Sequence, residues 1–404
     1  MEEDTSEKII NQLSPSISST VITTYLQLHS KGPMNRREFV SKGCLSLGAT
    51  TIPLLSPLEA AGQAASTGQI AKPRRIIIDT DPGVDDAFAL FLAFTSPEVK
   101  VEAITAVAGN VPLSLTLPNA LRLVEIAGRR DVPVAAGASG PLVRRLVTAT
   151  YAHGENGLAG AEFPEPTLQP VAEHAVDLIH RIVKQSPQQI TLVALGPLTN
   201  VALALQSDAS LAGQIQSIAM MGGSLSGGNV SPAAEFNFYV DPEAASIVFN
   251  SGIPITMVGL DVTEKVSFSA SHLAALEAGS GPISKAAAMI GRKVMENAAK
   301  RGRTGFNMHD PLALSSLLDP RILTLQDYLI KIESAGLYSA GASYGYKHSP
   351  VRGSAPMQYS DDSNVARQDA FTPNARVATE VSSGLFFELL IPRLSGSYKK
   401  AAGS

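Results

Sequence analysis

The sequence is poor in cysteine, charged residues and aromatic residues. Its 404 residues include one cysteine, Cys44, and no tryptophan, and aromatic side chains make up 5%. A single cysteine excludes a disulfide within the chain and a cysteine metal site. Only 17% of the residues are charged and the formal net charge is −4, so nothing in the composition suggests nucleic acid as a partner. No apolar stretch of roughly 18 or more uncharged residues occurs outside the N-terminus, which excludes a protein that crosses a membrane several times.

The chain has ample material for a large core, since 45% of its residues are hydrophobic. Strand-like and helix-like segments alternate along it. Strands are predicted at 74–79, 101–109, 132–137, 189–195, 215–223 and 254–260, and helices at 88–94, 118–128, 175–185, 197–206, 242–252 and 283–300. This alternation predicts an α/β fold with an open, mostly parallel central sheet and helices on both faces. With no internal repeat and no linker, we expect a single domain over residues 72–396.

The stretch IIIDTDPGVDDAF, from Ile76 to Phe88, is the most informative part of the chain. A run of β-branched apolar residues, typical of a buried parallel strand, ends in four aspartates around a Pro82-Gly83 turn, and the helix-like AFALFLAF follows. In an open α/β sheet, ligands bind in the crevice beyond the carboxyl ends of the strands. The turn is therefore expected to bring its carboxylates to the functional edge of the sheet.

The four aspartates of this turn, Asp79, Asp81, Asp85 and Asp86, predict a divalent metal site. Carboxylates this close repel one another unless a cation lies among them, and hard oxygen ligands suit Ca²⁺ or Mg²⁺ better than Zn²⁺. A solvated acidic turn that caps the helix is the simpler alternative. The apolar strand before the turn and Gly83, which lets the backbone fold tightly against a ligand, favour the metal site.

Further motifs follow the acidic turn. VAGN ends at Asn110 after a strand-like stretch, YAHGENGLAG carries His153 in a glycine-rich loop, and LVALGPLTN, at 192–200, has the pattern of a buried strand, a turn and a helix start. The segment MMGGSLSGGNVSPAAEFNFYVDPEAA is rich in glycine but carries isolated polar side chains. NMHDPLAL places a histidine and an aspartate at the start of a helix.

These motifs, in this order from about Arg74 to Leu394, resemble those of the nucleoside hydrolases, which are calcium-dependent enzymes that cut the N-glycosidic bond of ribonucleosides. The resemblance implies that Ca²⁺ is the cofactor and that a ribonucleoside is the small-molecule substrate, released as free base and ribose. Such a reaction passes through an oxocarbenium-like transition state, so its site needs a carboxylate-rich face, an activated water and a way to stabilise the departing base.

The resemblance also implies roles for individual residues. Asp85 is expected to be the general base that takes a proton from a Ca²⁺-bound water. Asp79 is expected to brace the turn without touching the ion. At Leu195 the family commonly has threonine, but only the main-chain oxygen is asked to coordinate, so leucine should serve. The expected metal ligands are Asp81, Asp86, Asp310 and the backbone carbonyl of Leu195.

Polar residues of the later motifs are implied to bind the substrate. The expected ribose ligands are Asn110, Asn229, Glu235 and Asn237. A site built for three ribose hydroxyls should reject 2′-deoxy substrates, because the partners of the missing hydroxyl would be left unpaired. Taken alone, an Asn in a glycine-rich loop is more simply a turn residue.

Two histidines are implied to lie near the base. The resemblance places His309 where it can protonate the leaving base and makes His153 a substrate-binding residue. The chain lacks the tryptophans that sandwich the base in purine-specific members and the tyrosines found before this histidine in several pyrimidine-preferring ones. The base preference is therefore left open, with the base pocket expected to be lined by Met295, Asn297, Arg301 or Phe306.

The N-terminal residues 1–66 resemble an export leader. Arg36 and Arg37, followed by Phe39, a weakly apolar stretch and small residues, are similar to a twin-arginine signal, which implies a periplasmic or secreted protein. A basic-containing tail on a cytoplasmic enzyme is the alternative. Met1 and Met34 are the two candidate starts of translation. No stable membrane insertion is expected.

A polar segment at 347–373, rich in Ser, Pro and Asp, is expected to be an exposed insertion, with a subunit contact as the alternative. Because related enzymes form dimers or tetramers, a homo-oligomer is expected here too.

Two other classes of protein share a feature with this sequence. A phosphohydrolase of the haloacid dehalogenase type also ends its first strand in DxD, so that Asp79 and Asp81 would be nucleophile and acid. That class gives no role to the DPGVDD continuation or to the AEFN and HDP motifs. A non-catalytic periplasmic nucleoside-binding protein would fit the leader, but such proteins have two lobes and this chain shows one α/β run with a metal cluster.

Overall fold

The computed structural model describes residues 72–347 and 372–398. The predicted leader at 1–66, with Arg36, Arg37 and Cys44, lies outside the described residues, as does nearly all of the segment at 347–373. Residues from Pro73 onward belong to one compact unit. Within the described ranges, no helix combines the length and hydropathy needed to cross a bilayer.

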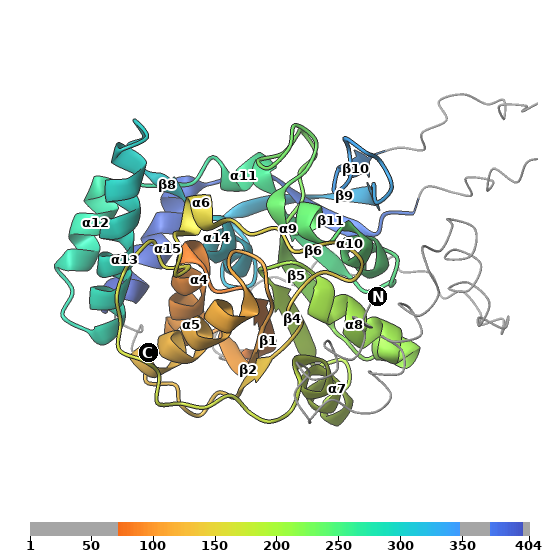
Figure 1. The fold of residues 1–404 in the computed structure, drawn as a ribbon, viewed down its shortest axis with the longest axis horizontal. Coiled ribbons are helices and arrows are strands. Elements are labelled where there is room, and N and C mark those ends of the chain that lie inside the picture. The colour runs from red at the N-terminus through yellow and green to blue at the C-terminus, as the bar shows by residue number, and fades with distance from the viewer. Residues whose placement is uncertain (1–71, 348–371, 399–404) are drawn as a thin grey trace, which may run out of the picture. The chain divides into compact units, whose positions relative to one another are not determined.

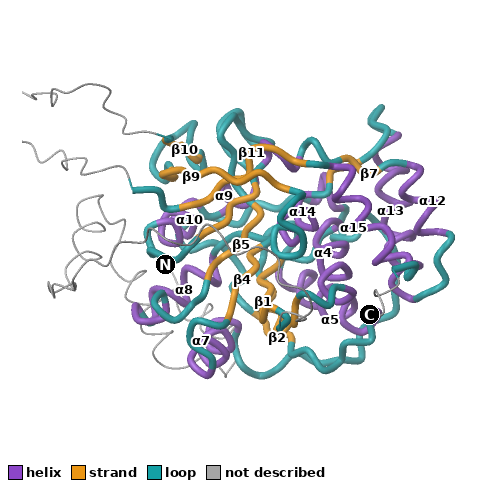
Figure 2. The backbone as a smooth tube through the Cα atoms, turned by 180° about the vertical axis from the view of Figure 1, so that it is seen from behind, coloured by secondary structure: helices purple, strands orange, loops and turns teal. Residues whose placement is uncertain are grey.

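A nine-stranded sheet forms the centre of the domain, in the order β10-β9-β11-β6-β5-β4-β1-β2-β3 (Figures 1 and 2). The seven strands from β11 to β3 are paired in parallel, whereas β9 runs antiparallel to both β11 and β10. The open, mostly parallel sheet confirms the predicted fold class. The nine strands are Arg74–Thr80 (β1), Val99–Ala106 (β2), Val134–Ala136 (β3), Ile190–Ala194 (β4), Ser217–Met221 (β5), Ile255–Val258 (β6), Leu323–Ile332 (β9), Ser343–Tyr346 (β10) and Ala375–Val381 (β11).

Helices cover both faces of this sheet, and a short two-stranded sheet pairs Ser267–Phe268 (β7) with Phe306–Asn307 (β8). The longer helices are Val84–Thr95 (α4), Leu113–Ile126 (α5), Ala175–Gln185 (α7), Thr199–Ser207 (α8), Pro242–Phe249 (α10), Ala270–Glu277 (α12), Pro282–Ala299 (α13), His309–Ser315 (α14) and Ser383–Ser395 (α15). Shorter ones are Thr150–His153 (α6), Phe236–Val240 (α9) and Leu260–Thr263 (α11), with a 3₁₀ turn at Ala209–Leu211 (η1).

The sheet separates two hydrophobic cores. Ile76 and Ile78 of β1 pack into the core that includes α4, α5, α13, α14 and α15, while Ile77 packs into the core that includes α7, α8 and α10. Side chains alternate between the two faces of a strand, so a strand buried on both sides must be apolar throughout. This explains the uninterrupted isoleucine run that precedes the acidic turn.

All six predicted strands and all six predicted helices are present, with most ends shifted by a few residues. The additional helix α12 and the short helices α6, α9 and α11 were not predicted. The parallel strands β1, β2, β4, β5 and β6 end at one edge of the sheet. The turns that follow them there form the site described below.

Candidate active site

The acidic turn joins the end of β1 to the start of α4. Asp86 lies in the first turn of α4 and caps it: its Oδ2 accepts a hydrogen bond from the Gly83 N–H at 2.9 Å, and its Oδ1 accepts one from the Thr80 hydroxyl at 2.5 Å. An acidic side chain at a helix N-terminus also meets the positive end of the helix dipole. The capping role expected of a plain acidic turn is therefore present, but Asp86 is fully buried, which a solvated turn does not explain.

Three carboxylates meet at this point. Oxygens of Asp85, Asp86 and Asp310 lie within 4.8 Å of one another, and all three residues are buried. Asp310 comes from the first turn of α14, so the cluster joins two helices distant in sequence. Burial, and then the neighbouring carboxylate charges, raise the pKa of Asp310 well above its usual range and also raise that of Asp86. A cluster with this charge and burial is suited to hold a cation.

Asp81 lies beside this cluster, and its carboxylate is closely surrounded by neighbouring residues. Its Oδ2 accepts a hydrogen bond from the Asn110 N–H at 2.6 Å, while its buried Oδ1 has no hydrogen-bond partner among the described residues. A Cβ at either Gly109 or Gly196 would collide with the Asp81 carboxylate, so both positions need glycine. Burial and the charge of Asp86 raise the pKa of Asp81. An unpartnered buried carboxylate oxygen at the edge of an acidic cluster fits a metal ligand.

Asp79 points away from the cluster and is held separately. Its Oδ1 accepts hydrogen bonds from the Thr105 hydroxyl and the Asn200 amide, both at 2.7 Å. Burial raises the pKa of Asp79 to about 7 despite these two bonds. Asp79 thus ties β1 to β2 and to the start of α8, which agrees with the bracing role expected of it.

The amide side chains predicted to bind ribose also support the acidic turn. The Asn110 amide donates to Asp86 Oδ2 at 3.0 Å and to the Asp81 carbonyl at 3.2 Å. The Asn237 amide donates to the Leu195 carbonyl at 2.9 Å, the same carbonyl that was predicted to be a metal ligand. A carbonyl oxygen has two lone pairs, so this bond leaves room for a second partner.

Glu235 has a structural role that the sequence did not reveal. It is the N-cap of α9, and its carboxylate accepts hydrogen bonds from the N–H groups of Asn237 at 2.9 Å, Gly223 at 2.9 Å and Phe238 at 3.2 Å. Burial raises the pKa of Glu235 even so. Asn229, which is exposed, accepts a bond from the Phe236 N–H at 3.0 Å.

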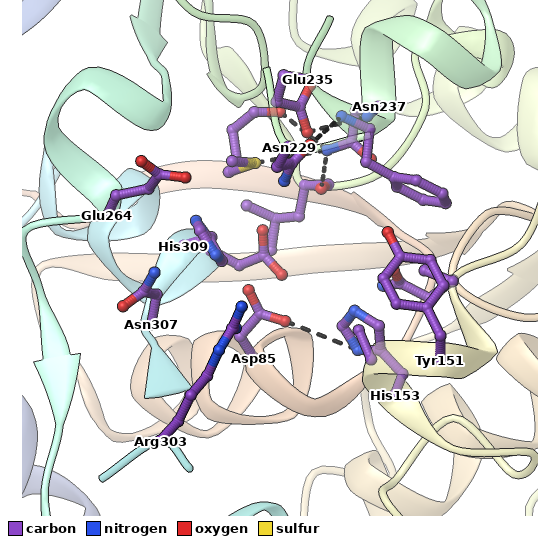
Figure 3. A pocket seen from close by; sticks show the side chains of 17 residues that line it. Asp85, Tyr151, His153, Asn229, Glu235, Asn237, Glu264, Arg303, Asn307 and His309 are labelled. Atoms are coloured by element: carbon purple, nitrogen blue, oxygen red, sulfur yellow. Dashed lines mark hydrogen bonds and ion pairs between the residues drawn. The ribbon is translucent and has the colours of Figure 1, made fainter. Parts of the chain in front are cut away.

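The two predicted histidines lie on different walls of the site (Figure 3). His153 belongs to α6, and its Nδ1 accepts a hydrogen bond from the Val84 N–H at 3.1 Å and lies 4.0 Å from Asp85 Oδ1. Because Nδ1 accepts, the proton of the neutral ring is on Nε2. Burial lowers the pKa of His153, which favours this neutral form. His309 starts α14, and its Nδ1 lies 2.8 Å from the Thr263 hydroxyl.

A cavity of about 390 Å³ brings these residues together, a volume in the usual range for small-molecule sites. In Figure 3 Asn229, Glu235 and Asn237 lie on one side, Tyr151 and His153 on another, and Glu264, Arg303 and Asn307 on a third. Of the predicted site residues, the cavity lining includes Asp85, Asn110, His153, Leu195, Asn229, Glu235, Asn237, His309 and Asp310. Asp81 and Asp86 lie beneath this lining, bonded to Asn110.

The expectation for the base wall was wrong. The lining contains Arg303 and Asn307 rather than the four residues proposed from the sequence. Phe306 packs instead against Phe88 and Phe268, with ring centroids 6.0 and 5.0 Å away. Tyr151, Phe236 and Glu264 were also missed, although Tyr151 is the first residue of the motif YAHGENGLAG and Phe236 lies between Glu235 and Asn237 of a second motif; Glu264 lies in neither.

Comparison with known proteins identifies the family of the chain. The family model described as inosine-uridine preferring nucleoside hydrolase matches residues 76–388, so the chain belongs to this family. A relative named pyrimidine-specific ribonucleoside hydrolase RihA, from Salmonella gallinarum, is 43% identical over 321 residues, which cover 79% of this chain and 97% of the relative. A protein with the same name from Photobacterium profundum is 46% identical over 270 residues, covering 66% and 87%.

Solved structures show the same architecture. A plant nucleoside hydrolase, the PpNRh1 enzyme, aligns with a TM-score of 0.73 at 33% identity, covering 80% of this chain and 99% of that one. A purine-preferring ribonucleoside hydrolase from Gardnerella vaginalis aligns with a TM-score of 0.70 at 29% identity, covering 80% and 98%. These similarities leave no role for a haloacid dehalogenase-type reaction.

Proposed function

We propose that this protein hydrolyses the N-glycosidic bond of ribonucleosides and releases free base and ribose. The observation that carries the proposal is the buried carboxylate cluster of Asp85, Asp86 and Asp310 on the floor of a cavity with amides on one wall and histidines on two others. Membership of the family and the names of its relatives support the same activity.

Asp85 is proposed as the general base. It lines the cavity within the cluster, where its carboxylate can take the proton of a water that attacks the anomeric carbon of the ribose. As the bond to the base breaks, electrons move to the base, and His309, which also lines the cavity, is proposed to protonate it. The Thr263 hydroxyl, 2.8 Å from Nδ1, leaves Nε2 of His309 for this task.

The carboxylate cluster fits Ca²⁺, which we propose as the cofactor. Asp81, Asp86, Asp310 and the Leu195 carbonyl offer only hard oxygen donors, and the Asp81 Oδ1 lacks a partner among the described residues. A bound cation would offset the repulsion of the carboxylates, lower the pKa of a water and hold ribose hydroxyls.

A second assignment exchanges two of these roles. Asp85, predicted as the base, lies within the 4.8 Å cluster, whereas Asp81, predicted as a metal ligand, lies beside it with a free Oδ1. Asp81 would then be the base. Replacing each by Asn separates the assignments: the base variant should retain Ca²⁺ binding, measured by calorimetry, and lose most turnover. The Asn variant of the aspartate that ligates the metal should lose both Ca²⁺ binding and turnover.

Asn110, Asn229, Glu235 and Asn237 are proposed to bind the ribose hydroxyls. All four line the cavity, and Asn229, Glu235 and Asn237 lie on one side of it in Figure 3. A 2′-deoxyriboside would lose the contacts made by the 2′-hydroxyl, so 2′-deoxyribosides should react at least about a hundredfold more slowly.

We propose pyrimidine ribonucleosides as the preferred substrates. The support is the name shared by the relatives at 43% and 46% identity. The chain has no tryptophan to stack on a purine, and Arg303 and Asn307 offer polar contacts to a base edge.

The test is release of free base from uridine, cytidine, inosine, adenosine and 2′-deoxyuridine by the purified protein, with and without a chelator. Cleavage of ribosides that the chelator abolishes and Ca²⁺ restores supports the activity and the cofactor, and the relative rates decide the base preference. A folded protein that binds uridine without cleaving it would instead be a nucleoside-binding protein.

We also propose that the protein is exported and that it forms a homo-oligomer. The twin-arginine-like segment suggests a periplasmic or secreted enzyme, tested by fractionating cells that make the chain with Arg36 and Arg37 intact or replaced by lysine. A homo-oligomer, tested by light scattering, is suggested by the family resemblance.

A further inference from the structure

Two walls of the cavity are joined by side chains from the end of α13. The Arg301 guanidinium donates a hydrogen bond to the Tyr151 carbonyl at 2.5 Å, and the Asn297 amide donates one to the Ala159 carbonyl at 3.3 Å. Both acceptors lie in the segment that contains α6. This segment carries Tyr151 and His153 on the cavity wall, so α13 is bonded directly to one side of the site.

The end of α13 explains why Arg301 points there. Gly302 adopts a left-handed φ of +71°, its N–H donates to the Ala299 carbonyl at 3.0 Å, and the Arg303 N–H donates to the Ala298 carbonyl at 3.0 Å. This pair of bonds is a Schellman motif, which ends a helix and redirects the chain. As a result Arg301 bonds to the α6 segment while Arg303, two residues later, lines the cavity.

The α6 segment needs such support. Helix α6 is a single turn, and the last carbonyls of a helix have no partner within it. The bonds that hold the turn itself include the Ala149 N–H to the Asn110 carbonyl at 2.9 Å, the Val84 N–H to His153 Nδ1 at 3.1 Å and the Ala159 N–H to the His153 carbonyl at 2.7 Å. Tyr151 lies between them and is 57% exposed, so the Arg301 bond holds the outer side of the turn.

We propose that Arg301 is a positioning residue that holds the α6 turn, with Tyr151 and His153, against the cavity and thereby sets the affinity for substrate. The proposal rests on the proposed function, because the wall it holds is the wall of the nucleoside site. Arg301 acts through the Tyr151 carbonyl and does not itself line the cavity. A guanidinium makes a stronger bond to a carbonyl than a neutral donor does.

The test compares Arg301→Ala and Arg301→Lys with Arg292→Ala. Arg292 is the matched control, because it is an exposed arginine of α13, the helix that Arg301 follows, and its partner is Glu277 of α12. Amide hydrogen exchange of residues 149–161 is measured without substrate, together with KM and kcat for uridine.

Arg301→Ala should speed exchange in this segment and raise KM about threefold to tenfold, the size expected for one charge-assisted hydrogen bond near the surface, with kcat changed less than about twofold. Arg301→Lys should restore part of both, and Arg292→Ala should match the wild type.

Unchanged exchange and unchanged KM in Arg301→Ala would overturn the proposal. A raised KM with unchanged exchange would overturn it too, because Arg301 would then touch substrate directly. If the wild type cleaves no riboside, the proposed function fails, while the exchange measurement still decides whether Arg301 holds the turn.

Discussion

Removing the cation should destabilise this protein by an amount that grows with pH. The perturbation is a chelator, applied at about pH 5 and about pH 8, and the physical reason is the buried cluster of Asp85, Asp86 and Asp310. Without a cation these carboxylates repel one another when ionised. With protons on them, the repulsion disappears.

The size of the effect follows from the distances. Two unit charges 4.8 Å apart repel by about 3 kcal/mol at an effective dielectric constant of about 20, so each ionised pair of the cluster costs at least this much. For a domain of this size, each kcal/mol corresponds to roughly 1.5 °C in the melting temperature. Chelation at the higher pH should therefore lower the melting temperature by about 5 °C for each ionised pair.

The sign follows from the direction of the pKa shifts. Burial raises the pKa values of Asp86 and Asp310 above the unfolded value, so the folded state without metal binds protons that the unfolded state has already released. Its stability is therefore greatest near or below the ordinary aspartate pKa of about 4 and falls as pH rises through the raised values. Asp79, with a pKa of about 7, adds to the same trend.

Scanning calorimetry with added Ca²⁺ or a chelator measures the effect. Asp319→Asn is the control, because Asp319 pairs with Arg321 outside the cluster and its charge should not alter the chelator-induced shift. A shift that is equal at both pH values, or absent at the higher one, would refute the reasoning that the cluster holds a cation.

Three further predictions concern single side chains. Thr263→Val keeps the shape but removes the hydroxyl 2.8 Å from His309, so kcat/KM should fall about tenfold while the melting temperature stays near the wild-type value. Glu235→Gln turns an amide towards backbone N–H donors, so urea unfolding should show a loss of about 1–3 kcal/mol and the KM should rise. Arg393→Ala leaves Glu98 without its bidentate partner at 2.7–2.8 Å, which should lower the unfolding free energy by about 2–3 kcal/mol without changing KM; an unchanged urea midpoint would contradict this.

The parts of the fold that could be predicted are those with strong local patterns. The isoleucines of β1 and the regular apolar spacing of α7 identify a buried strand and an amphipathic helix, and α7 occupies the predicted range, Ala175–Gln185. Helix α12 was missed because few of its residues are buried, so its apolar residues follow no clear helical period. The antiparallel strand β9, which lies between β10 and β11, carries no local mark of its direction.

The candidate site shows the same division. The aspartates, amides and histidines lie in recognisable motifs, and the structure places them around one cavity or directly beneath it. The base wall was predicted wrongly because the left-handed Gly302 redirects the chain after α13 and brings Arg303 into the lining. The capping role of Glu235 depends on the Gly223 N–H, a contact between separate segments that no local pattern reveals.

The division of β1 between two cores bears on how the family can diversify. The strand that delivers the acidic turn is packed on both faces, so the floor of the site shifts only if both cores do. Tyr151, Glu264 and Arg303, by contrast, lie on exposed segments around the rim. Substitutions on these exposed segments should therefore cost the fold little, whereas a change at the acidic turn disturbs two packed cores.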